Sequence, residues 1–122
     1  MRIGIGIVGA GLMGGAMAAR LLALGHAVTV RDIEPRREAE VAALGATVAP
    51  SPAALARASE VVIVAVVDGA QTHEVLFGAT GAAAALPPGA AVLLCPTIAP
   101  QDVEAAAARL AAGGHACIDA PM

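Results

Sequence analysis

The residues best suited to chemistry in this 122-residue chain form a glycine turn, GAGLMG, at residues 9–14. Where such a turn joins a strand to a helix, its first glycine allows a tight turn and its second lets the backbone approach a pyrophosphate. The third glycine lets the helix pack close to the strand, and the start of the helix offers free N–H groups to phosphate oxygens. The turn therefore predicts a dinucleotide site, with contacts from Gly9, Ala10, Gly11, Leu12, Met13 and Gly14.

An acidic residue, Asp32, follows Gly14 by eighteen positions and ends the next apolar run. A carboxylate at this place accepts hydrogen bonds from the adenosine ribose of NAD and repels the 2′-phosphate of NADP, so we expect NAD rather than NADP. The basic residues that could favour the phosphate instead are Arg31, Arg36 and Arg37. The last two fit better on the solvated face of a helix that also carries Glu38 and Glu40.

The uncharged run at residues 3–19 has two other interpretations, a secretion signal and a short membrane span. Gly11 and Gly15 even form a GxxxG pair, which marks a packing face in membrane helices. Each glycine inside a helix costs about 1 kcal/mol relative to alanine, and six of these residues are glycines. The glycine content therefore argues against both interpretations, and we expect no membrane segment.

Alternating strands and helices follow the glycine turn. We expect strands at 3–8, 27–30, 46–49, 61–67, 91–95 and 116–120, and helices after the turn and at 34–45, 51–58, 70–77 and 101–112. Ser51 fits an N-cap, and Pro52 fits the first helical position after it. The run VVIVAVV at 61–67 is typical of a strand buried on both faces. The sequence therefore predicts an α/β fold, a doubly wound parallel sheet of the Rossmann NAD(P)-binding type, as one domain over residues 1–122.

Ligands of such sheets bind beyond the carboxyl ends of the strands. Those ends lie at 9–14, Asp32, 66–68, 95–97 and 119–122, and we expect them to line one crevice.

Groups for acid–base or metal chemistry are sparse. His26, His73 and His115 have no metal-ligand spacing and fit surface or loop positions, and Cys95 and Cys117 fit small core residues in a reducing compartment. Asp68, at the end of a strand, suits a turn or a helix cap, and Asp119 also suits a structural position. We therefore expect no metal site.

Composition narrows the classes of partner. The formal net charge is −3 without a block of like charge, which argues against a nucleic-acid surface. All seven basic residues are arginine, so the chain contains no lysine. Because aromatic residues make up 1% of the chain, Ala, Val, Leu and Ile must build the core.

Four segments together resemble the β-hydroxyacid dehydrogenase family, which includes 3-hydroxyisobutyrate, tartronate semialdehyde and 6-phosphogluconate-type enzymes. They are GIVGAGLMGGAMAARLLALGHAVTVRD, VVIVAVVDGAQTHEVLFG, CPTIAP and IDAPM, and they extend over essentially the whole chain. The second segment is most similar to the sugar-acid branch, such as the L-threonate dehydrogenases. The resemblance implies hydride transfer between a nicotinamide cofactor and a small β-hydroxy acid or sugar acid. The absence of targeting signals and the cofactor class lead us to expect a cytoplasmic location, and we expect a homo-oligomer when the enzyme is complete.

The resemblance also assigns residues beyond the glycine turn. Val66, Val67 and Gln71 correspond to a Leu-Pro pair and a polar residue that touch the cofactor in the family. Thr97 corresponds to a threonine near the nicotinamide and the substrate, although a helix cap is an equally good interpretation. Val66-Val67 in place of Leu-Pro changes the rigidity of that contact. Pro96, in place of a serine, removes a hydroxyl and a backbone donor.

The greatest departure concerns catalysis. The family carries a catalytic lysine in an all-helical second domain, and this chain ends at Met122 without any lysine. We therefore expect no catalytic residue in the chain, and His73 fits a solvated helix position better than an acid–base one. Two alternatives stay open, a stand-alone NAD(H)-binding sensor and another Rossmann reductase of the imine or ketopantoate type.

Overall fold

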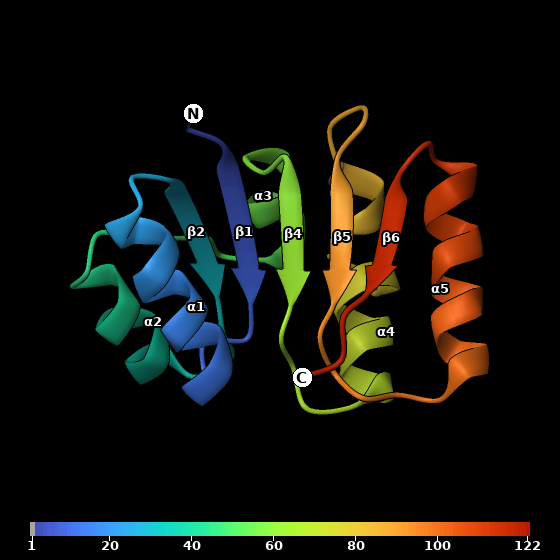
Figure 1. The fold of residues 1–122 in the computed structure, drawn as a ribbon, viewed down its shortest axis with the longest axis horizontal. Helices are drawn as coiled ribbons and strands as arrows, with labels where there is room; N and C mark the ends of the chain where they lie inside the picture. Colours follow the sequence, from blue (N-terminus) through green and yellow to red (C-terminus); the bar gives the residue numbers. More distant parts are fainter. Residues whose placement is uncertain (1) are drawn as a thin grey trace.

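A six-stranded parallel sheet with helices on both faces forms the molecule in the computed structural model, which describes residues 2–122 (Figure 1). Its strands are β1 (Gly4–Val8), β2 (Ala27–Arg31), β3 (Thr47–Val48), β4 (Val61–Val64), β5 (Ala91–Leu94) and β6 (Ala116–Asp119). The α-helices are α1 (Leu12–Ala23), α2 (Pro35–Ala42), α3 (Pro52–Arg57), α4 (Gly69–Phe77) and α5 (Pro100–Ala112), with a short 3₁₀ helix at Ala83–Ala85.

The strand order is β3-β2-β1-β4-β5-β6, and every neighbouring pair is parallel. The chain therefore starts at the middle of the sheet, runs to one edge, returns to the middle and runs to the other edge. This order creates a switch point between β1 and β4, where ligands of open α/β sheets bind. The predicted fold class, a doubly wound parallel sheet of the Rossmann type, is confirmed.

Two apolar layers cover the sheet. One layer packs buried residues of β1 and β2 against α1 and α2, with Ala18 and Val41 as the buried helix positions. The other layer packs β4 and β5 against α3, α4 and α5, and it includes Leu55, Leu76 and Leu110. Figure 1 shows α1 and α2 in front of the sheet and α3 and α4 behind it.

The alternating sequence of β1 explains how these layers approach the central strand. Ile5 and Ile7 point into the layer formed with α1 and α2. A side chain at Gly6 would overlap the side chain of Leu55 and lie 2.5 Å from the hydroxyl of Ser59. The strand therefore carries isoleucine toward one layer and glycine toward the other, because α3 packs directly against its backbone.

The structure corrects the predicted strand at 61–67. β4 ends at Val64, where its neighbours also end, since Val64 is paired with Val8 of β1 and Leu94 of β5. Without partner strands the chain leaves the sheet, and Val67 is 81% exposed. The edge strand β3 is likewise two residues long and exposed, shorter than the four residues expected.

His115 lies in the loop between α5 and β6, as expected, but it is buried. Its Nδ1 lies 3.0 Å from the carbonyl oxygen of Ala90, so the ring joins two loops at the amino ends of β5 and β6. Both cysteines are free, and Cys95 is buried while Cys117 is half-buried. None of the helices within residues 2–122 is long and apolar enough to cross a membrane.

Candidate functional site

A cleft of about 920 Å³ opens at the carboxyl ends of the strands, beside the switch point between β1 and β4. This volume lies within the range of typical small-ligand sites. With the exception of Ala10, every residue predicted to contact a cofactor lines the cleft: Gly9, Gly11, Leu12, Met13, Gly14, Asp32, Val66, Val67, Gln71 and Thr97. The fold thus brings together residues that are up to 88 positions apart in the chain, from Gly9 to Thr97.

Two glycines of the turn are required by the fold itself. Gly9 has φ +99°, a conformation that L side chains rarely adopt, and a side chain there would lie 2.5 Å from the carbonyl oxygen of Ala65. A Cβ at Gly14 would overlap the carbonyl oxygen of Gly9. Glycine is therefore needed at both positions for β1, the loop after β4 and α1 to pack together, whether or not a ligand is bound.

Gly11 is different, because the fold leaves space for a side chain at this position. Its φ is −72°, and a Cβ added there would have Nη1 of Arg37 as its nearest neighbour, at 3.8 Å. That distance is ordinary van der Waals contact. Packing therefore does not require glycine at this position, which lines the cleft.

The first turn of α1 is prepared for an anion. The first hydrogen bond within this segment runs from the Gly15 N–H to the Gly11 carbonyl oxygen at 2.8 Å, so the N–H groups of residues 12–14 precede it. The N-cap, Gly11, offers no side-chain hydrogen bond, and the first turn contains no acidic residue. By contrast, Ser51 caps α3 and Asp68 caps α4 through their side-chain oxygens. The free N–H groups and the helix dipole at α1 therefore favour a bound phosphate.

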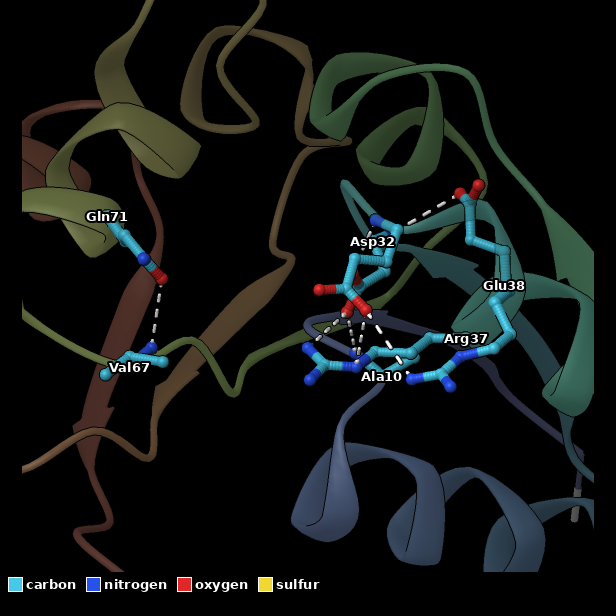
Figure 2. A network of polar contacts seen from close by, with 8 residues as sticks. Ala10, Asp32, Arg37, Glu38, Val67 and Gln71 are labelled. Carbon is cyan, nitrogen blue, oxygen red and sulfur yellow. Dashed lines mark hydrogen bonds and ion pairs between the residues drawn. The ribbon is translucent and has the colours of Figure 1, made fainter.

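Asp32 connects the glycine turn to the end of β2. Its carboxylate is buried, with Oδ2 accepting the N–H of Ala10 at 2.7 Å and Oδ1 accepting the N–H of Glu34 at 2.8 Å. Figure 2 shows the carboxylate turned toward Ala10 and Arg37. Each carboxylate oxygen can accept more than one hydrogen bond, so these two bonds leave acceptor capacity on Asp32. They do show that Asp32 also holds the turn in place.

The start of α2 carries a group of paired charges. Arg36 and Glu40 are exposed, as expected for a solvated face, whereas Arg37 and Glu38 are half-buried, which corrects that expectation for these two residues. Arg37 lines the cleft, with Nε 3.3 Å from Glu34 Oε2 and Nη1 3.9 Å from Asp32 Oδ2. The side chain of Glu38 is only 12% exposed, and its Oε2 lies 3.7 Å from Nη1 of Arg31. These side chains turn back toward the end of β2 because the helix begins directly after it.

The loop after β4 forms the opposite wall of the cleft. The Val67 N–H donates to Oε1 of Gln71 at 3.1 Å, and Figure 2 shows this pair across the cleft from Asp32. Asp68 accepts the Gln71 N–H at 2.9 Å, as expected for a capping carboxylate. Its carbonyl oxygen also accepts the hydroxyl of Thr72, which is buried beneath the first turn of α4. The loop is therefore held by its own polar groups.

The end of β5 supplies the remaining wall. Cys95 and Pro96 are buried, and Thr97 is exposed to the cleft. Thr97 does not cap α5, because the N-cap of that helix is Ala99 and it has no side-chain bond. Burial raises the pKa of the Cys95 thiol, so this group stays protonated and is a poor nucleophile at neutral pH.

Eight further residues line the cleft that the sequence analysis did not identify: Val8, Ile33, Glu34, Pro52, Ala65, Glu74, Val75 and Thr80. Glu74 and Val75 follow Gln71 by three and four positions, so helical periodicity placed them on the same face of α4. The carbonyl oxygen of Thr80 accepts the N–H of Ala53, which brings this loop to the start of α3. No sequence signal indicates that long-range contact.

The other candidate acid–base groups lie away from the cleft. His73 is exposed on α4 and packs edge-on against Phe77, with ring centroids 5.5 Å apart. Asp119 is exposed at the end of β6. Within residues 2–122, no three His, Cys, Asp or Glu side chains gather in a way that could hold a metal ion.

The sequence of residues 4–122 matches the family model described as the NAD binding domain of 6-phosphogluconate dehydrogenase. The chain is 42% identical over 118 residues to L-threonate dehydrogenase of Cupriavidus necator, covering 97% of this chain and 40% of that protein. It is 35% identical over 118 residues to 3-hydroxyisobutyrate dehydrogenase of Pseudomonas aeruginosa, with the same coverage of 97% and 40%.

The fold is similar to that of solved structures. The structure of Mycobacterium tuberculosis 3-hydroxyisobutyrate dehydrogenase with L-serine superposes with a TM-score of 0.91 at 29% identity, covering 99% of this chain and 40% of that one. An imine reductase from Myxococcus stipitatus in complex with NAD+ also reaches a TM-score of 0.91 and covers 100% of this chain and 41% of that one. Its identity of 23% shows a shared fold alone. The chain spans about 40% of the length of the curated relatives that it matches.

The family match covers nearly the whole chain and includes the glycine turn, Asp32, the β4 loop and Thr97. Relatives above 30% identity carry the same family's names, including the L-threonate branch. The chain therefore belongs to the family of NAD-binding domains found in 6-phosphogluconate dehydrogenase and the β-hydroxyacid dehydrogenases.

Proposed function

We propose that this chain is the NAD-binding part of an oxidoreductase that transfers a hydride between a nicotinamide cofactor and a small β-hydroxy acid or sugar acid. The observation that carries the proposal is Gly11. It leaves open space at the mouth of the cleft, next to the uncapped first turn of α1. A Cβ would fill this space, and a pyrophosphate is the group that needs it left empty.

The residues around the cleft suit the parts of a dinucleotide. The glycine turn and the first N–H groups of α1 would hold the pyrophosphate, and Asp32 would accept the hydroxyls of the adenosine ribose. Val66, Val67, Gln71 and Thr97 would lie along the nicotinamide half, because they line the far wall of the same cleft. When bound, the nicotinamide supplies the hydride acceptor or donor.

NAD is favoured over NADP by the acidic residue at the end of β2. Asp32 brings a buried negative charge to the adenosine side of the cleft, where NADP would place its 2′-phosphate. Solved relatives include complexes with each cofactor, among them Psf3 with NADP+, which is 31% identical and has a TM-score of 0.86. The selectivity of this chain therefore depends on its own charges.

The acid–base group of the reaction lies outside this chain in our proposal. Hydride transfer from a hydroxy acid requires a group that takes the hydroxyl proton, and the family uses a lysine that has no counterpart among these residues. Thr97 would contribute a substrate contact at the exposed end of β5. The proposal includes a cytoplasmic homo-oligomer in the complete enzyme, whose small hydroxy-acid substrate matches those named for the relatives.

The test is a calorimetric titration of the chain with NADH and then with NADPH, since the absence of Trp and Tyr makes intrinsic fluorescence a poor probe. We expect saturable binding of NADH at one site and weaker binding of NADPH. Circular dichroism on the same sample reports whether the protein is folded. A folded sample that binds neither cofactor would contradict the proposal.

A further inference from the structure

Glu34, the residue just before α2, lies between two arginines at the adenosine side of the cleft. Its Oε2 is 3.3 Å from Nε of Arg37 and 3.9 Å from Nη2 of Arg36. Glu34 and Arg37 both line the cleft, and the side chains of Glu34 and Arg37 are 49% and 41% exposed. The pair is therefore accessible to solvent and to a ligand on that side of the cleft.

Asp32 alone does not decide the charge at this end of the cleft. Its side chain is 4% exposed, and its oxygens already accept the N–H groups of Ala10 and Glu34. Arg37 Nη1 lies 3.9 Å from Oδ2 and partly balances the carboxylate. The most accessible acidic group beside Arg37 is thus the carboxylate of Glu34.

The guanidinium of Arg37 is well placed to meet a phosphate on the ribose. It borders the backbone of Gly11, where a Cβ would lie 3.8 Å from Nη1, and it lines the same cleft as Asp32. Arginine binds phosphate oxygens with two parallel N–H groups when its own donors are free. In this structure the Glu34 carboxylate lies 3.3 Å from Nε of Arg37 and opposes the positive charge of the guanidinium.

We propose that Glu34 determines cofactor specificity by acting as a positioning residue on Arg37. Its carboxylate holds the guanidinium and offsets its positive charge, so that Arg37 is not free to bind a 2′-phosphate and NADP is disfavoured while NAD is unaffected. The inference rests on the proposed binding of a dinucleotide in the cleft. The backbone contact of Glu34 with Asp32 is made by its N–H, so a change of the side chain leaves that contact in place.

The experiment compares Glu34→Gln with the unaltered chain by titration with NADH and NADPH. We expect the affinity for NADPH to rise about fivefold to tenfold in Glu34→Gln, because tenfold is worth only about 1.4 kcal/mol and one nearby charge supplies that much. The affinity for NADH should change by less than about twofold. The gain for NADPH should shrink at high salt, because exposed charges are screened.

Glu40→Gln is the matched control. It removes a negative charge six positions further along, within α2, at an exposed position that forms no ion pair within residues 2–122. We expect it to leave the NADPH-to-NADH ratio unchanged. The double variant Glu34→Gln/Arg37→Gln, compared with Arg37→Gln, should lose the gain, because the proposed effect acts through Arg37.

The outcomes separate this inference from the proposed function. Failure of the unaltered chain to bind either cofactor would contradict dinucleotide binding itself. NADH binding with an unchanged ratio in Glu34→Gln would overturn the inference alone, as would an equal rise in Glu40→Gln. A gain that persists without Arg37 would also overturn it, since Glu34 would then act by another route.

Discussion

Asp32→Asn tests whether the buried carboxylate holds the glycine turn. Both oxygens of Asp32 accept backbone N–H groups, from Ala10 at 2.7 Å and from Glu34 at 2.8 Å. An asparagine has the same shape but only one oxygen, so its NH₂ group must face one of these two donors. The substitution therefore leaves one N–H without an acceptor whichever way the amide turns.

The expected cost follows from burial and charge. Ala10 is 5% exposed, so its N–H has little access to water when the carboxylate is lost. A hydrogen bond to a charged group contributes about 1.5–3 kcal/mol, and an unsatisfied buried donor costs about 1–3 kcal/mol. We expect Asp32→Asn to lower the free energy of unfolding by about 2–3 kcal/mol.

Urea unfolding followed by far-ultraviolet circular dichroism measures this loss. Asp68→Asn is the matched control, because Asp68 caps α4 at an exposed position and asparagine caps helices as well as aspartate does. The control should lose less than about 0.5 kcal/mol. If Asp32→Asn is as stable as Asp68→Asn, the carboxylate does not hold the turn. A confirmed loss would also mean that weaker NADH binding in Asp32 variants does not by itself prove a ribose contact.

Three further predictions concern stability. Gly14→Ala should lower the free energy of unfolding by at least about 2 kcal/mol, because its Cβ would overlap the carbonyl oxygen of Gly9. Urea unfolding measures this loss, and a variant as stable as the unaltered chain would refute the close approach of α1 to Gly9. Asp68→Ala should cost about 1 kcal/mol, since it removes the side-chain cap of α4, and an unchanged unfolding midpoint would contradict that contact. Burial raises the pKa of both thiols, Cys95 and Cys117, above their usual 9.0, and the charge of a nearby aspartate adds to this for Cys117. Above pH 9 the unfolded chain therefore binds fewer protons than the folded one, so the free energy of unfolding should fall as pH rises. The chain has no Lys or Tyr whose titration would obscure this effect. A free energy of unfolding that does not change with pH in this range would count against the raised pKa values of the thiols.

The sequence was sufficient to predict the order of elements and most of the residues that line the cleft at the switch point. The glycine turn, the periodic apolar residues of α1 and the β-branched runs each carry a local signal that tertiary structure did not override. The end of β4 carried no such signal. Val66 and Val67 have the same strand propensity as Val64, and only the lengths of β1 and β5 end the pairing.

The ion pairs around Asp32 could not be predicted from the sequence, for a related reason. Periodicity assigns Arg37 and Glu38 to a polar face of α2, but it cannot show that this face lies against the end of β2. The distances from Glu34 to Arg37 and from Asp32 to Ala10 depend on how the loop turns after the strand. Such contacts require the three-dimensional arrangement, and they are the ones that set the electrostatics of the cleft.

The most direct test of the proposed function compares NADH binding by the unaltered chain and by Gly11→Ala. The fold has room for the added methyl group, so the variant should keep its free energy of unfolding within about 1 kcal/mol. We predict that its affinity for NADH falls at least tenfold, because the methyl group occupies the place of the pyrophosphate. A folded Gly11→Ala variant that binds NADH as tightly as the unaltered chain would contradict the assignment of the glycine turn as the phosphate-binding site.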